Sequence, residues 1–167
     1  MSSGSYYYMK LKGPDVEGSC KKVGYEGWSE IQSWGLQITN PVDVTKSTGG
    51  SLGPPNFSLF SFTKVRDKAS PKISKCLMNG EHFDEVVFEG RRTGQKGEEG
   101  PVFIRITLKN AKVGGVTPDC SSSSGPEPMS FAYDDITLEY FQLKTDGSQG
   151  PRIAAKYNVG SRESDDA

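Results

Sequence analysis

Residues 101–116 read PVFIRITLKNAKVGGV, and this stretch decides the fold class. Its first half alternates apolar side chains with polar or aromatic ones. The two sets are Val102, Ile104, Ile106 and Leu108 against Phe103, Arg105, Thr107 and Lys109. Because successive side chains of a strand point to opposite faces of a sheet, this period of two predicts a β-strand with one buried face.

Further short strands are expected on both sides of this one, separated by clusters of Gly, Pro, Ser and Asn. They are predicted at residues 6–12, 28–40, 57–65, 83–92, 130–144 and 152–159. Within residues 28–40, Gly35 and the off-phase Ile31 predict a bulge or bend near the middle of the strand. Residues 94–100 predict a hairpin turn, and the serine-rich residues 118–128 predict a flexible loop.

One short helix is predicted at about residues 71–79. Ser70 is a suitable N-cap, Pro71 suits the first helical position, and Gly80 provides a C-terminal stop. The helix has one apolar stripe, formed by Ile73, Cys76 and Leu77. The expected fold is therefore mainly β: an antiparallel β-barrel with one short flanking α-helix, with a β-sandwich as the alternative.

The composition limits the number of domains and the kinds of partner. The 167 residues are the length of one ordinary domain, expected over residues 1–167 with a polar tail at 160–167. Lys and Arg number 20 and Asp and Glu 21, so the net charge is −1 and no nucleic-acid partner is expected. No apolar run approaches the ~18 residues of a membrane-spanning helix. The N-terminal residues lack the apolar stretch of a secretory signal, so we expect synthesis in the cytoplasm without membrane insertion.

The few chemistry-bearing residues argue against an enzyme or a metal protein. Three widely spaced cysteines without a CxxC pair are expected to be free thiols: Cys20, Cys76 and Cys120. His82 is the single histidine, which excludes a zinc site with two histidine ligands. We interpret His82 as a structural residue at a strand edge rather than a general base acting with Asp84 or Glu85. No catalytic residue, metal ligand or cofactor is expected.

Three aromatic side chains fall on otherwise polar strand faces: Phe103, Tyr133 and Phe141. If they are exposed, they form a surface for a partner. If the helix and loops cover them, their role is structural. The residue pattern leaves both interpretations open.

Several short motifs follow one another in a specific order. They are Trp28, Ser33, Trp34 and Gly35; then Phe62, Thr63, Lys64, Asp67, Ser70 and Pro71; then Cys76, Gly80, His82 and Phe83; then Ile106–Val113 and Glu139–Tyr140. Over roughly residues 6–144 this order resembles the Hcp family, the hemolysin-coregulated proteins of bacterial type VI secretion. The motif from Phe62 to Pro71 is the most specific element, whereas residues 156–158 resemble the end of the family's sequence only loosely.

The resemblance implies a structural protein that assembles with itself. Hexameric rings would stack into the inner tube of a type VI secretion system, carry or chaperone effector proteins, and contact components such as the spike and the sheath. The protein would then be cytoplasmic before assembly and afterwards secreted without a signal peptide. Two alternatives are a phage-like tail-tube subunit and a monomeric β-sandwich module for carbohydrate binding or adhesion. The module would use Trp28 and Tyr6–Tyr8 as stacking platforms.

Two surfaces are candidates for the contacts that such a tube needs. The loop at residues 41–56 is long enough to reach a neighbouring ring, and its candidate stacking residues are Asp43, Val44, Thr45, Lys46, Ser47 and Leu52. Ser33, Gln37 and Thr39 are candidates for the face that lines the tube lumen. Small uncharged polar groups would suit a channel to which passing proteins must not adhere.

Asp67 is expected to have a structural role. It lies three residues before the predicted N-cap Ser70, so its carboxylate can accept hydrogen bonds from the loop backbone near the positive end of the helix dipole. We therefore expect its loss to weaken folding or ring formation.

Overall fold

The computed structural model describes residues 5–41, 54–94, 98–118, 121–161 and 163–165. The strands of these residues are β1 (Tyr6–Lys12), β2 (Ser29–Gly35), β3 (Ile38–Thr39), β4 (Asn56–Phe57), β5 (Phe60–Val65), β6 (His82–Thr93), β7 (Glu99–Val116), β8 (Pro126–Ala132), β9 (Asp135–Leu143), β10 (Gln149–Asn158) and β11 (Glu163–Asp165). Their one helix is α1 (Ser70–Asn79), between β5 and β6.

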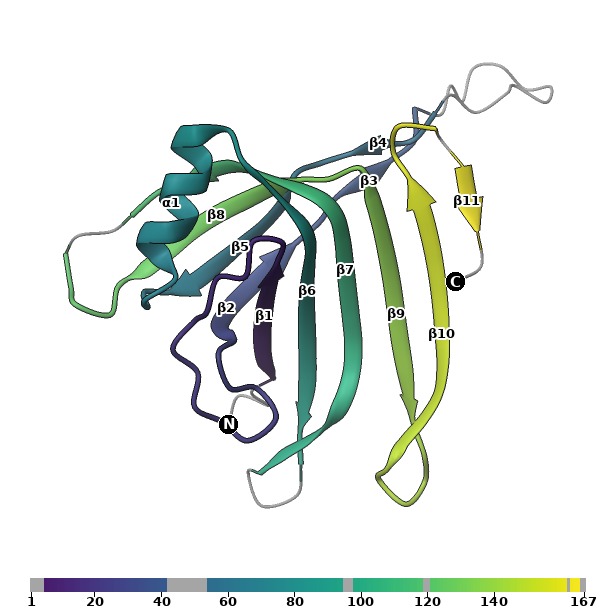
Figure 1. Cartoon of the computed structure of the whole chain (residues 1–167). Helices are drawn as coiled ribbons and strands as arrows, with labels where there is room; N and C mark the ends of the chain where they lie inside the picture. Colours follow the sequence, from purple (N-terminus) through teal and green to yellow (C-terminus); the bar gives the residue numbers. More distant parts are fainter. Residues whose placement is uncertain (1–4, 42–53, 95–97, 119–120, 162, 166–167) are drawn as a thin grey trace.

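Six strands close into an antiparallel barrel (Figure 1). The hydrogen-bonded order runs β7-β6-β1-β2-β5-β8, and β8 pairs with β7 to complete the ring. On the same edge of β7 that pairs with β8, but further toward its start, the sheet continues through β9 and β10 to the short β11. We call β9 and β10 the wing, because they extend beyond the closed barrel. The predicted barrel with one flanking helix is confirmed.

Strand β7 belongs to both the barrel and the wing because it changes partner partway along. Residues Ile104 to Lys109 pair with β9, and residues Lys112 to Val116 pair with β8. Between the two sets lies Asn110, whose φ of 52° is left-handed, a conformation that asparagine tolerates better than most residues. The backbone turns at this corner, and the carbonyl of Lys109 accepts a hydrogen bond from the amide of Asp134.

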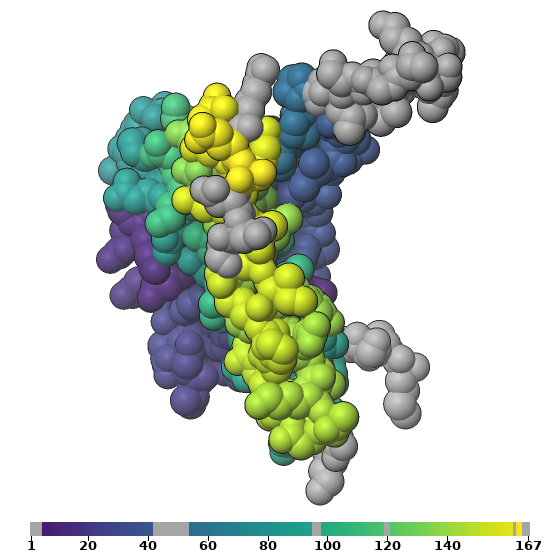
Figure 2. Space-filling model, turned by 90° about the vertical axis from the view of Figure 1, so that its right-hand side faces the viewer, coloured from purple at the N-terminus to yellow at the C-terminus, as the bar shows by residue number. Residues whose placement is uncertain are grey.

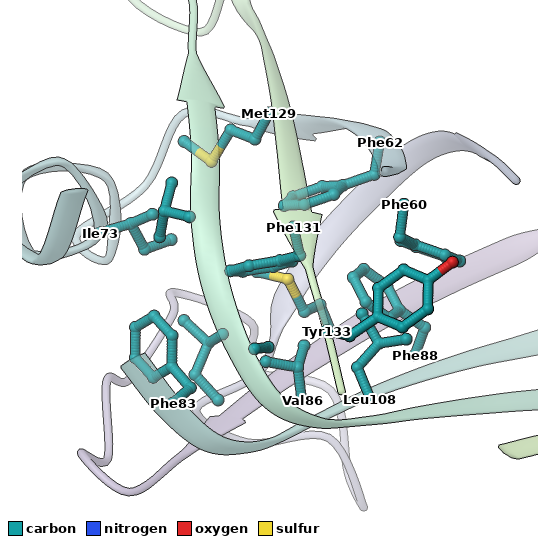
Figure 3. Close-up of a cluster of buried hydrophobic side chains, with 14 of the residues drawn as sticks. Phe60, Phe62, Ile73, Phe83, Val86, Phe88, Leu108, Met129, Phe131 and Tyr133 are labelled. Carbon is teal, nitrogen blue, oxygen red and sulfur yellow. The ribbon is translucent and has the colours of Figure 1, made fainter. Parts of the chain in front are cut away.

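Aromatic rings fill the barrel (Figure 3). Phe131 lies between Phe62, which stacks on it with ring centroids 5.3 Å apart, and Phe83, which meets it edge-on at 6.1 Å. Helix α1 covers one end of the barrel with Ile73, which is fully buried. Each such side chain contributes about 2–3 kcal/mol by leaving water, so the packed core holds the barrel closed.

Three predicted strands are each interrupted. Residues 28–40 form β2 and β3, with the predicted bulge confirmed between Ile31 and Ser33. Residues 57–65 divide between β4 and β5, and residues 130–144 divide between β8 and β9. In the last case the break at Tyr133 lets the chain pass from the barrel to the wing, and the Tyr133 hydroxyl donates to the Ser58 carbonyl at 3.0 Å.

The helix differs from the prediction at its start. Ala69, not Ser70, is the N-cap residue, and no side chain caps the helix because the Ser70 hydroxyl is used elsewhere. The end is as predicted: Gly80 has a φ of 67°, and its amide donates to the carbonyls of Cys76 and Leu77. The apolar stripe is narrower than expected, since Leu77 is 37% exposed whereas Cys76 is buried.

Candidate functional surfaces

The motif at residues 62–71 forms a buried polar network around Lys64, whose side chain has no exposed surface. Its ammonium group donates to the Val65 carbonyl at 2.8 Å, to Asp67 Oδ1 at 2.8 Å and to Ser70 Oγ at 2.7 Å. Glu127 Oε1 lies 3.3 Å away. A buried charge is tolerated only when it is paired and hydrogen-bonded, and this one is surrounded by oxygen atoms.

Asp67 connects this network to the segment that joins β1 and β2. Its carboxylate accepts hydrogen bonds from the Ala69 amide at 3.0 Å, the Ser29 hydroxyl at 2.8 Å and the Ser19 amide at 3.3 Å. The Ser70 hydroxyl bonds to Glu127 at the start of β8. One charged cluster therefore holds together β2, β5, β8 and the beginning of α1.

The other residues of the motif lie on alternate faces of β5. Phe62 is buried in the core, and Thr63 points to the opposite face. Pro71 occupies the first turn of α1, where its missing amide hydrogen costs no helical hydrogen bond. The motif thus supplies a core side chain, a polar network and a helix start within ten residues.

A shallow hollow lies on the outer face of β2, β5 and β8. It encloses about 390 Å³, and its lining includes Ser33, Ser61, Thr63, Thr117 and Ser130. The strand register explains the grouping: Ser33 is opposite Thr63, and Ser61 is opposite Ser130. None of the residues that line the hollow is ionisable. Trp34, Phe62, Pro128 and Met129 also contribute to the lining, so the result is a contiguous uncharged surface on which hydroxyl groups lie beside apolar ones.

The candidate lumen residues fall in two places. Ser33 lines this hollow, whereas Gln37 and Thr39 lie further along the chain, outside its lining. The backbone of Gln37 bonds to Ser58, and Thr39 pairs with Asn56 in the β3–β4 ribbon. All three candidate side chains are exposed. In Figure 2 the right-hand outline of the molecule curves inward, and the blue segment that carries β2 and β3 forms the upper part of that outline.

Sequence reasoning missed most of the uncharged face. Ser61 and Thr63 alternate with Phe60, Phe62 and Lys64, so their period of two could have placed them opposite the core. Ser130 joins them only through the pairing of β5 with β8, which local sequence does not specify.

The candidate stacking residues, Asp43 to Ser47 and Leu52, lie outside the described residues. The ribbon of β3 and β4 leads to them (Figure 1). At its base Phe57 stacks on Tyr157 of β10 with ring centroids 4.8 Å apart, which fixes where the ribbon leaves the barrel.

Two of the three aromatic residues considered for a partner surface are buried. Tyr133 is 9% exposed against the core, where burial raises its pKa to about 12, and Phe141 is 8% exposed. Phe103 is half-buried beneath the Arg92 guanidinium, 5.2 Å from its ring centroid. For Tyr133 and Phe141 the interpretation as exposed partner residues is therefore wrong.

The aromatic residues considered as carbohydrate platforms are also largely engaged. Tyr8 is 4% exposed and stacks on Tyr25 with ring centroids 4.2 Å apart, while Tyr7 packs on Trp34 with ring centroids 4.6 Å apart. Trp28 meets Tyr25 edge-on at 5.0 Å. These rings use their faces within the protein, which disfavours a module that stacks sugars on them.

The remaining chemistry-bearing residues do not gather into a site. His82 is 49% exposed, with Asp84 Oδ1 3.8 Å away and itself largely in solvent. Cys20 and Cys76 are free and buried, and burial raises the pKa of both thiols, which lowers their reactivity. Cys120 lies outside the described residues. Within the described part of the chain, no group of three His, Cys, Asp or Glu residues could hold a metal ion, and no helix is long and apolar enough to cross a membrane.

These observations define the class of the protein. It is a small β-barrel in which a buried ionic network supports the structure, and its distinctive surfaces are an uncharged face, a ribbon and a wing.

Comparison with known proteins identifies the family. The profile of the family described as "Type VI secretion system effector, Hcp" matches residues 8–140. A curated relative, Protein hcp1 of Pseudomonas aeruginosa, is 26% identical over 154 residues, covering 90% of this chain and 94% of the relative. The chain belongs to the Hcp family, and it is a secreted tube component of a type VI secretion system.

Solved structures agree with this assignment. One described as a type six secretion system protein matches with a TM-score of 0.85 at 20% identity, covering 97% of this chain and all (100%) of that one. Hcp1 from Salmonella typhimurium matches with a TM-score of 0.73 at 17% identity, covering 96% of this chain and 99% of that one. Hcp1 from the E. coli EAEC 042 pathovar matches with a TM-score of 0.71 at 25% identity, covering 89% of this chain and 96% of that one. Membership of the family implies tube assembly by self-association.

Proposed function

We propose that this chain assembles into closed hexameric rings, that the rings stack into the inner tube of the secretion system, and that the uncharged face of β2, β5 and β8 lines the tube. The observation that carries this proposal is the hollow lined by Ser33, Ser61, Thr63 and Ser130. A channel for proteins needs a surface that hydrates well and carries no fixed charge, because fixed charges attract or repel cargo according to its own charge.

Two further features support stacking. The β3–β4 ribbon extends from the barrel, the loop at residues 41–56 follows β3 in the sequence, and the Phe57–Tyr157 stack holds the base of the ribbon. A ribbon fixed at one end can present a loop to the next ring. The candidate stacking residues Asp43, Val44, Thr45, Lys46, Ser47 and Leu52 remain part of this proposal.

The role we propose is structural, without catalysis, metal or cofactor. The buried ionisable groups of the Lys64 network are used for folding. The expected partners are further copies of this chain, the spike and sheath components, and effector proteins. The protein would be cytoplasmic until assembly and extracellular after secretion.

Sedimentation of the purified protein tests the assembly. The account predicts a species of about six times the 18.2 kDa chain mass, and longer assemblies at high concentration. A protein that stays monomeric at every concentration would contradict the proposal and favour a monomeric binding module.

The lining role is tested separately by adding bulk inside the hollow. Ser33→Trp should leave the ring intact and reduce the amount of effector that co-purifies from cells expressing the whole secretion system. Lys75→Trp, on the exposed side of α1 and outside the lining of the hollow, is the matched control and should leave co-purification unchanged. Normal effector recovery with Ser33→Trp rings would rule out this face as the lining.

A further inference from the structure

The wing has an apolar strip on the face that continues the barrel core. Tyr140 of β9 and Ile153 of β10 are direct cross-strand partners, and they are 46% and 57% exposed. Leu138, two residues before Tyr140 on the same face, packs against the core. The apolar face of the sheet therefore runs past the end of the barrel, where no described segment covers it (Figure 1).

Arg92 adds a cation to this strip. Its Nη2 donates to the Tyr140 hydroxyl at 3.0 Å, and its guanidinium lies 5.2 Å from the Phe103 ring centroid and 5.9 Å from that of Tyr140. The aromatic contacts hold it in place, but among the described residues it forms no ion pair. We call Arg92, Tyr140 and Ile153 the wing strip.

The opposite face of the same strands is different. There Arg105 pairs with Glu89 at 2.8 Å, and Glu139 lies between Arg105 and Arg152. The Tyr25 hydroxyl donates to Glu89 at 2.6 Å. The charges of that face pair with one another, whereas the wing strip exposes apolar area, and its Arg92 has no ion-pair partner among the described residues.

We propose that the wing strip is the lateral contact of the assembly, and that it docks on a different surface of a second copy of this chain. The inference rests on the proposed ring. A two-fold pairing centred on Tyr140 would bring the two Arg92 guanidinium groups together, and like charges at a contact cost free energy. The strip must therefore meet another surface, and a contact between two different surfaces can close a ring.

The chain carries the charge that such a contact needs. Asp15, Glu26 and Glu30, near the connection between β1 and β2, are exposed and have no ion-pair partner among the described residues. Figure 1 shows this connection on the other side of β6 and β7 from the wing. Such a carboxylate from one copy can neutralise Arg92 of its neighbour, while Tyr140 and Ile153 leave water.

The first test changes one side chain of the strip. Ile153→Lys should raise the concentration at which rings half-dissociate by about tenfold or more, because the strip is an apolar anchor of the contact. Lys156→Glu, on the opposite face of the same strand, is the control and should assemble as the wild type does. Circular dichroism checks that both variants fold. If wild type forms rings and Ile153→Lys forms them equally well, this inference fails and the proposed function stands; if wild type forms no ring, both fail.

The second test identifies the surface that the strip meets. A photo-crosslinking amino acid at position 153 should join two copies in assembled samples, and mass spectrometry should map the joined peptide outside residues 135–158. Crosslinks that map to the wing itself, or an assembled sample without crosslinks between copies, would overturn the inference.

Discussion

Lys64 is the residue at which the fold and the family motif meet. Its ammonium group has oxygen atoms from Val65, Asp67, Ser70 and Glu127 as neighbours, and no water reaches it. In such a place the loss of one partner costs more than the pair itself contributes, because the remaining charge stays buried and uncompensated. The network therefore acts as a connection between strands that must be complete to be stable.

Asp67→Ala should lower the free energy of unfolding by about 3 kcal/mol, because it leaves Lys64 with less compensation and removes the acceptor for Ser29. Asp84→Ala is the control: that side chain is 76% exposed, so its loss should change stability by less than about 0.5 kcal/mol. Chemical denaturation measures both. Equal stability of Asp67→Ala and wild type would refute the structural role.

Glu85 gives the pH dependence a testable sign. Hydrogen bonds from Lys109 at 2.6 Å and Lys12 at 2.8 Å lower the pKa of its carboxyl group. A pKa lower in the folded than in the unfolded state means that the ion pairs stabilise the protein above the unfolded pKa of about 4.3. That stabilisation is lost as the pH falls through the folded pKa.

Glu85→Gln should therefore be less stable than wild type at pH 7 by under about 1 kcal/mol, since both lysines are exposed. The difference should disappear in strong acid. Denaturation of both proteins from neutral to acid pH measures it. A stability difference between Glu85→Gln and wild type that grows as the pH falls would contradict the role assigned to the Glu85 ion pairs.

At the scale of elements, the sequence predicted correctly those strands and helix ends that depend on interactions between neighbouring residues. Residues 6–12 form β1 as expected, and Gly80 ends α1 as expected, because strand alternation and a left-handed C-cap depend on neighbouring residues. The breaks in residues 28–40 and 130–144 depend on distant partners, so periodicity alone could not locate them. The Ser70 hydroxyl also depends on a tertiary contact: its residue type suits an N-cap, but the hydroxyl accepts a hydrogen bond from the buried Lys64 instead.

For the candidate surfaces too, features set by neighbouring residues could be predicted, whereas features set by distant strand pairing could not. Exposure of Ser33 could be predicted from its alternation with Trp34. The hollow that it shares with Ser130 exists because β5 lies between β2 and β8, a matter of topology. The burial of Tyr133 could not be decided from the sequence, because its strand ends there and the chain turns its ring toward Phe57, with ring centroids 6.4 Å apart.

Deletion of residues 44–52 tests the ribbon as a stacking element. The ribbon's base is held by the Phe57–Tyr157 stack, which the deletion leaves in place, so the variant should fold and form single rings. It should fail to form longer tubes, which electron microscopy of concentrated protein would show. Full-length tubes from the deletion variant would remove the loop from the stacking contact.

For the whole molecule, the closed barrel leaves its outer surfaces for contact with other molecules. The uncharged face and the wing strip lie on different strands of the large sheet, and the ribbon of β3 and β4 is a separate two-stranded sheet (Figure 1). A tube requires three contacts of different kinds, namely with the cargo, with the next copy in a ring and with the next ring. Their separation allows each to be changed by substitution without disturbing the others.

A cryo-electron microscopy map of the assembled protein tests the central claim most directly. The account predicts a closed hexameric ring in which Ser33, Ser61 and Ser130 line the central channel. A map that places these residues on the outer surface, or particles that remain monomers, would contradict it.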